Sequence, residues 1–148
     1  MNSGRLSARK KRCYLVTLVD RATRCLLAFS VTFSPDWESL QSVVDRGKKA
    51  LRYFSDGFPV YRDLIYPGKA KHEVAPGKSQ TYSVEAHNAE LRHYLARLAR
   101  KSRCFSRCPK ALHRAVWLFA CAWNARQLHR KEFPDYCKTL GECLPAIN

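Results

Sequence analysis

Apolar positions change their spacing several times along the chain, and each change marks the boundary of a predicted element. Residues 13–19 are nearly all apolar or β-branched, residues 20–24 favour a turn, and residues 25–33 form a second apolar run. Two short runs joined by a polar turn are typical of a β-hairpin, and continuous apolar content favours strands that are covered on both faces. We therefore predict a hairpin whose strands belong to the core.

Helical spacing follows the hairpin. Ser34, Pro35 and Asp36 are residues typical of a helix start, and apolar positions then recur at helical spacing to about Arg52. The remaining pattern predicts a strand over 53–55, a short helix over 58–65, a strand over 71–75, a loop over 76–80, long helices over 83–103 and 109–128, and an irregular tail from 133.

The predicted helix from Ser83 has two different sides when its residues are placed 100° apart. One side is apolar and is expected to be buried; it carries Val84, Leu91, Leu95 and Leu98, flanked by His87 and Tyr94. The opposite side carries Glu85, Asn88 and Arg92. Glu85 is therefore expected to project away from the core near the helix start, where an acidic side chain also interacts favourably with the helix dipole.

Composition limits the class of protein. A chain of 148 residues that is 46% hydrophobic is long enough for one domain with a core of its own. Its 27 Lys and Arg outnumber 12 Asp and Glu, a net charge of +15 that favours a polyanionic partner. Residues 91–114 hold eight basic residues and no acidic one, so we predict contact between DNA and this stretch.

The cysteines and the longest apolar runs indicate in which cellular compartment the protein is expected. The cysteines number seven, an odd count, and no signal-peptide pattern opens the chain, which favours a reduced cytoplasmic protein. Cys104 and Cys108 have no second close pair, which disfavours structural zinc. No apolar run reaches the roughly 18–20 residues of a membrane span, so a membrane partner is not expected.

Two segments then resemble a known family. Asp56 follows a predicted strand and Glu85 begins a helix, which is how ribonuclease-H-like nucleases and transposases hold divalent metal ions. The stretches Ser55–Tyr61 and Val84–Ser106 resemble the catalytic core of DDE transposases of the insertion-sequence-one family. The resemblance covers about residues 13–128. It implies an α/β fold of the ribonuclease-H-like (integrase-like) type, with a mixed sheet and flanking helices.

The resemblance also implies roles for individual residues. Asp56 matches the family's second catalytic Asp and Glu85 its catalytic Glu, and both would hold Mg²⁺ or Mn²⁺ in a two-metal site. Asn88 and Arg92 match accompanying positions of the same helix. Together with the basic stretch, the expected DNA-binding residues are Asn88, Arg92, Arg97, Arg100, Lys101, Arg103, Arg107 and Lys110.

The chain departs from the family pattern at its beginning. The family's first catalytic Asp lies in an opening strand, and nothing before Cys13 has the pattern of that strand. Asp20 either shapes the hairpin turn or supplies the missing carboxylate. We therefore expect a basic flexible arm over 1–12, a truncated catalytic domain over 13–130 that lacks the first strand, and an irregular tail over 131–148.

Two functions remain open at this point. The first is a truncated transposase with an incomplete DDE triad, which cleaves and transfers DNA strands in its intact form but is expected to be inactive as this chain alone. The alternative is a non-catalytic DNA-binding remnant or regulator of transposition. Either would work in a bacterial-type cytoplasm at the nucleoid, with DNA and with self-association or intact transposase as partners. A small ribosome-associated protein would explain the charge but not the acidic pair.

These expectations make two structural predictions. The strands that end at Val19, Phe33 and Ser55 should share one sheet, and the carboxylates of Asp56 and Glu85 should face one another at its carboxyl end.

Overall fold

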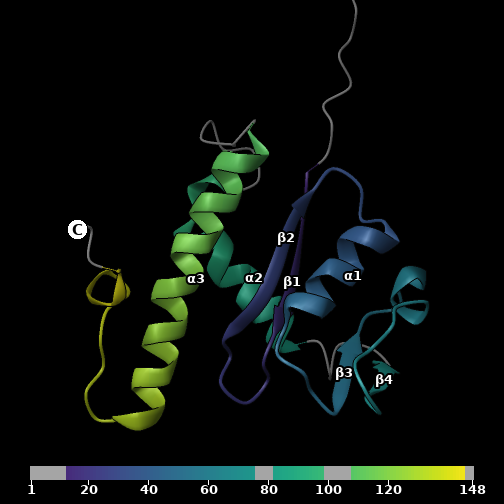
Figure 1. Cartoon of the computed structure of the whole chain (residues 1–148). Helices are drawn as coiled ribbons and strands as arrows, with labels where there is room; N and C mark the ends of the chain where they lie inside the picture. The colour runs from purple at the N-terminus through teal and green to yellow at the C-terminus, as the bar shows by residue number, and fades with distance from the viewer. Residues whose placement is uncertain (1–12, 76–81, 99–107, 146–148) are drawn as a thin grey trace, which may run out of the picture.

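The computed structural model describes residues 13–75, 82–98 and 108–145, and these form a mixed α/β arrangement (Figure 1). The predicted arm over 1–12 and loop over 76–80 lie outside the described residues. The strands are β1 (Tyr14–Val19), β2 (Leu26–Thr32), β3 (Arg52–Ser55) and β4 (Lys71–Val74), and the helices are α1 (Trp37–Arg46), α2 (Tyr82–Tyr94) and α3 (Pro109–Glu132). Short 3₁₀ turns cover Pro59–Arg62, Ala96–Leu98 and Gly141–Cys143.

The predicted hairpin is confirmed. β1 and β2 pair antiparallel, with Thr17 opposite Phe29, and the register shifts by a bulge after Leu18. At the turn, the Arg24 N–H donates to the Asp20 carbonyl at 2.8 Å. Arg24 takes a positive φ of 59°, which a residue other than glycine adopts at some cost.

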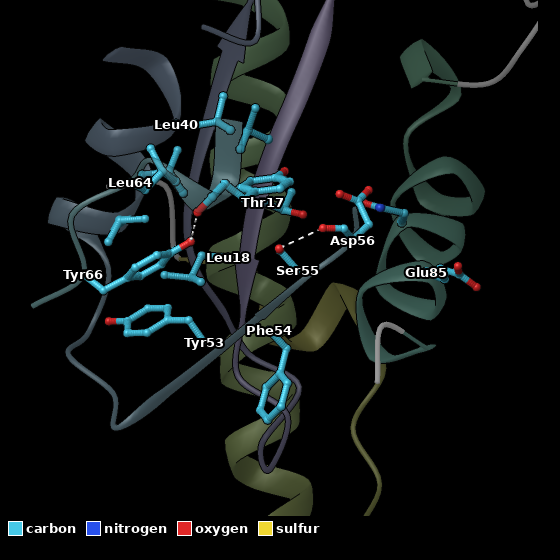
Figure 2. A pocket seen from close by; sticks show the side chains of 15 residues that line it. Thr17, Leu18, Leu40, Tyr53, Phe54, Ser55, Asp56, Leu64, Tyr66 and Glu85 are labelled. Atoms are coloured by element: carbon cyan, nitrogen blue, oxygen red, sulfur yellow. Dashed lines mark hydrogen bonds between the residues drawn. The ribbon is translucent and has the colours of Figure 1, made fainter. Parts of the chain in front are cut away.

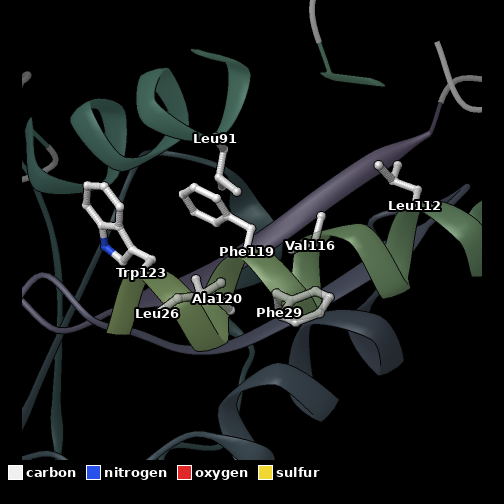
Figure 3. Packing of buried hydrophobic residues seen from close by; sticks show 8 residues of the cluster. All are labelled: Leu26, Phe29, Leu91, Leu112, Val116, Phe119, Ala120 and Trp123. Carbon is white, nitrogen blue, oxygen red and sulfur yellow. The ribbon is translucent and has the colours of Figure 1, made fainter. Parts of the chain in front are cut away.

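β2 lies between two helices, α1 on one face and α3 on the other (Figure 1). Leu26 and Phe29 of β2 pack in one core cluster with Leu91 of α2 and Val116 and Phe119 of α3 (Figure 3). A second cluster joins Leu40 and Val44 of α1 to Tyr53 and Leu64. The prediction that apolar strands are covered on both faces is therefore confirmed for β2.

The prediction of one sheet for the first three strands is wrong. β1 and β2 form one two-stranded sheet, and β3 and β4 form a second, parallel one. Each strand of the described residues has a single hydrogen-bonded neighbour. The hydrophobic pattern placed each segment in a strand but carries no information about which strand pairs with which.

Three helix ends also differ from the sequence pattern. α1 ends at Arg46 instead of continuing to about Arg52, and the Gly47 N–H donates to the carbonyls of Val43 and Val44. A side chain at Gly47 would overlap that of Leu18, so close packing against β1 favours glycine there. α2 gives way to a 3₁₀ turn after Tyr94, while α3 extends past the predicted end at Leu128 to Glu132.

No helix in the described parts of the chain is long and apolar enough to cross a membrane.

Candidate functional site

A pocket of about 200 Å³ lies at the end of β3, between the two sheets and α1 (Figure 2). Asp56, Glu85 and Asn88 all border it, so the structure brings Asp56 together with two residues that follow it by 29 positions or more. The rest of its wall is mainly apolar and is formed by Val16, Thr17, Leu18, Leu40, Val43, Val44, Tyr53, Phe54, Ser55, Tyr61, Leu64 and Tyr66.

The pocket follows the edges of two strands. Consecutive side chains of a strand point to opposite faces of its sheet. The pocket nevertheless touches the consecutive residues Val16–Leu18 of β1 and Tyr53–Ser55 of β3, so it must run along the strand edges. These edges carry no strand partner among the described residues.

Asp56 is exposed and directly follows β3. One oxygen of its carboxylate accepts a hydrogen bond from the Phe58 N–H at 3.1 Å. The negative charge of Asp56 contributes, after burial, to raising the pKa of Tyr61. The carboxylate is therefore oriented by the turn after β3 while it stays accessible to a ligand.

Ser55 and His72 lie beside Asp56. The Ser55 hydroxyl donates to the Asp56 carbonyl at 2.9 Å and lies 2.8 Å from the His72 Nε2. His72 stacks on Tyr66, with 4.7 Å between the ring centres. Burial, and then the charge of Arg62, lower the pKa of His72, so its neutral form is favoured next to Ser55.

Glu85 and Asn88 reach the pocket from α2. Glu85 lies in the first turn of this helix and is exposed, as the helical pattern predicted. In Figure 2 the Glu85 carboxylate points away from Asp56. The predicted arrangement, in which the two carboxylates face one another, is therefore not seen in this view. Both residues nevertheless border one pocket.

The donor set fits a hard divalent cation in part. Mg²⁺ binds through one or two carboxylates together with water and substrate phosphates, and Asp56 and Glu85 provide two carboxylates at one pocket. Among residues 13–75, 82–98 and 108–145, no group of three or more His, Cys, Asp or Glu is placed to hold a metal ion.

Comparison with known proteins decides the family. The model of the IS1 transposase family matches residues 6–121, a range that includes Asp56, Glu85 and Asn88. The chain belongs to the IS1 transposase family. It is similar to the insertion element IS1 protein InsB of Shigella flexneri, with 32% identity over 106 residues, which are 70% of this chain and 77% of that protein. No solved structure matches the chain. The resemblance found in the sequence is confirmed, and membership of a transposase family implies an interaction with DNA.

Asp20 of this IS1-family chain shapes the hairpin turn. Its carboxylate accepts hydrogen bonds from the Thr23 N–H at 3.0 Å and the Ala22 N–H at 3.4 Å, and from the Thr23 hydroxyl. The Thr23 hydroxyl is also the main cause of the lowered pKa of Asp20. Asp20 is not among the residues of the pocket that contains Asp56, and its hydrogen bonds support the turn interpretation.

The predicted DNA-binding stretch is described only in part. Arg92 on α2 and Lys110 on α3 are exposed, as is the nearby Arg114. Four predicted contacts, Arg100, Lys101, Arg103 and Arg107, lie outside the described residues, and of Arg97 only the backbone is described.

Sequence reasoning missed a second group of basic residues. Arg24 of the hairpin turn, and Arg126, Arg130 and Lys131 near the end of α3, border a common hollow. The only signal in the sequence was the basic run His129–Lys131. Basic residues are also common in the last turn of a helix, where they interact favourably with the helix dipole, so this run alone does not indicate a binding site.

Proposed function

We propose that this chain carries the catalytic face of a DDE transposase with a ribonuclease-H-like fold, in which Asp56 and Glu85 bind Mg²⁺ or Mn²⁺ at the DNA backbone. The observation that supports this best is the pocket at the end of β3 that Asp56, Glu85 and Asn88 border together. Family membership supports the transposase role.

The chemistry requires carboxylates that are accessible and held in place. A pair of divalent ions supplies activation of the attacking oxygen and stabilisation of the leaving oxygen during in-line displacement at phosphorus. Asp56 meets both requirements, because the Phe58 N–H fixes one carboxylate oxygen and the side chain is exposed. Glu85 is exposed on α2 and borders the same pocket, and the proposed DNA contact of the Asn88 amide lies beside it.

A third carboxylate has a natural place in this arrangement. An extended strand between β1 and β3 would pair with both of their free edges and fill the pocket that follows them. It would also join the antiparallel and parallel pairs into one mixed sheet, as a ribonuclease-H-like fold requires. If this strand ran parallel to β3, its last residues would lie at the same edge as Asp56. We infer that the catalytic triad is incomplete in the described residues and that this slot is where it is completed.

Two observations favour the alternative of a DNA-binding regulator without catalysis. The Glu85 carboxylate points away from Asp56 in Figure 2, and the described residues contain no three-ligand cluster. A regulator would bind DNA without requiring either carboxylate, so metal binding separates the two functions.

The test combines Mn²⁺ binding with a DNA cleavage assay. The chain, its Asp56→Asn and Glu85→Gln variants, and a Glu38→Gln control on the exposed face of α1 are titrated with Mn²⁺ in the presence of duplex DNA. We expect weak Mn²⁺ binding that both site variants lose and the control keeps, with cleavage at background level because the described residues bring only two carboxylates to the pocket.

Two results would contradict the proposal. Mn²⁺ binding that is absent, or unchanged in both site variants, favours the non-catalytic regulator. Robust cleavage by the chain that Asp56→Asn, Glu85→Gln and Asp20→Asn each abolish would make Asp20 the third catalytic residue and the triad complete.

A further inference from the structure

A second hollow, of about 490 Å³, is enclosed by the β1–β2 turn, α2 and the last turns of α3. Its α2 residues are Ala86, His87 and Glu90, whereas the pocket near Asp56 touches Glu85 and Asn88. At 100° per residue these two sets lie on different sides of α2. The hollow is therefore separate from the proposed catalytic pocket.

The side chains around this hollow are mostly cationic. Arg24, Arg126, Arg130 and Lys131 border it against one acidic residue, Glu90. Asp20 is nearby as well, since the charge of Lys131 contributes to lowering its pKa, but its carboxylate is occupied by hydrogen bonds within the turn. With Asp20 counted, the side chains at and near the hollow carry a net positive charge of about two, and such a group of cations favours an anion.

His87 provides the independent sign of a ligand. Its side chain is only 2% exposed, and neither ring nitrogen has a hydrogen-bond partner. Native proteins seldom leave a buried polar group without a hydrogen-bond partner. His87 is among the residues that border the cationic hollow, and its ring packs against Trp123, with 5.6 Å between the ring centres.

Contacts with neighbouring residues hold the side chain of Arg126 and the backbone of Arg24 at the rim. The Trp123 indole N–H donates to the Arg24 carbonyl at 2.9 Å, which fixes the turn against α3. The Arg126 guanidinium lies over the Trp123 ring at 5.9 Å, and its Nε donates to the Lys138 carbonyl at 3.1 Å. Preorganised cations lose less side-chain entropy when an anion binds.

We propose that this hollow binds a phosphate group, which Arg24, Arg126, Arg130 and Lys131 neutralise and to which the His87 ring donates a hydrogen bond. Phosphate offers several acceptor oxygens and up to two negative charges, which matches both the excess of cations and the missing partner of His87. The phosphate belongs either to a DNA backbone or to a free phosphate ion. Only the first source rests on the proposed function.

The experiment compares two double substitutions that remove equal charge. Arg130→Gln with Lys131→Gln lies at the hollow, and Lys48→Gln with Lys49→Gln lies after α1, away from the hollow. Binding of inorganic phosphate is measured by calorimetry and duplex DNA binding by fluorescence anisotropy over a range of salt concentrations. We expect the hollow variant to bind phosphate about tenfold more weakly, because it lacks two of the four cations that neutralise the anion and both are exposed to solvent, which screens each interaction. The Lys48/Lys49 control should match the unmodified chain.

The two sources give different outcomes in the DNA arm. If the hollow holds a DNA phosphate, the hollow variant also reduces the slope of log affinity against log salt by about one for each phosphate that is no longer neutralised. If it holds free phosphate, DNA binding is unchanged while phosphate binding falls. Absence of phosphate binding, or equal binding by both variants, overturns the proposal.

The role of His87 has a measurement of its own. Phosphate titration followed by ¹⁵N NMR should shift the His87 ring nitrogens, and the shift should disappear in the hollow variant. Ring nitrogens that do not respond to phosphate overturn the assignment of His87 as a donor. Because Mn²⁺ binding at Asp56 should be the same in the hollow variant, failure of this site and failure of the proposed catalytic site are distinguishable.

Discussion

Asn124 links α3 to the first residue of β2, and its replacement by Ala should remove a large part of the stability. Its amide oxygen accepts from the Leu26 N–H at 2.8 Å, and its amide nitrogen donates to the Leu26 carbonyl at 2.9 Å. Leu26 is 4% exposed, so water cannot readily replace either bond. The side chain thus pairs with this edge of β2 as a neighbouring strand would.

The expected loss follows from the two bonds. A buried donor or acceptor without a partner costs about 1–3 kcal/mol, and two such groups on one residue give about 2–5 kcal/mol after partial relaxation. At about 2–4 °C per kcal/mol for a domain of this size, Asn124→Ala should lower the midpoint of thermal unfolding by roughly 5–15 °C.

Urea denaturation followed by circular dichroism measures the free energy of unfolding directly. Gln127→Ala is the control, because it truncates a half-buried polar residue of the same helix whose side chain makes no contact with β2 in the described hydrogen bonds. It should change stability by less than about 0.5 kcal/mol. An equally small loss for Asn124→Ala would show that this amide does not close the edge of β2.

Four further outcomes are expected. Gly47→Ala should destabilise the chain by about 1 kcal/mol because its Cβ meets the Leu18 side chain, and a double-mutant cycle with Leu18→Ala should show that the two effects are not additive. Burial lowers the pKa of His87 to about 4, so the unfolded chain binds the proton more readily than the folded chain. The contribution of neutral His87 to the free energy of unfolding should be complete above about pH 6.5 and should fall toward pH 4. Urea titrations of a His87→Gln variant should lack this pH dependence. The outward-facing amides of β1 should exchange hydrogen faster than those of β2, as measured by NMR, because no strand pairs with that edge in the described residues; equal protection would indicate that the edge is covered. In salt titrations of DNA binding, Gln variants of the exposed residues Arg92, Lys110 and Arg114 should each lower the slope by about one unit if that residue neutralises a phosphate, and an unchanged slope would place the DNA surface elsewhere.

Local structure could largely be predicted from the sequence. The hairpin over β1 and β2, the short strands β3 and β4 and the start of α3 at Pro109 all lie where the apolar spacing placed them. Helix ends were less predictable: α1 ends at Arg46, and the Gly47 that follows it packs so closely against Leu18, 29 positions away, that an added Cβ would overlap that side chain. Hydrophobic periodicity reports which side of an element is buried, and it does not report what the element packs against.

The family and the candidate carboxylates could be identified without coordinates, because the segments around Asp56 and Glu85 carry a recognisable motif and the model of the IS1 transposase family matches them. The division of the strands into two separate sheets, and the pocket that Asp56, Glu85 and Asn88 border between strand edges, emerged only in three dimensions. The hollow that Arg24, Arg126, Arg130 and the unpartnered His87 border together also emerged only in three dimensions. Pairing between strand edges and the gathering of distant charges depend on chain positions far apart in sequence, whereas helical and strand periodicity depends on neighbours.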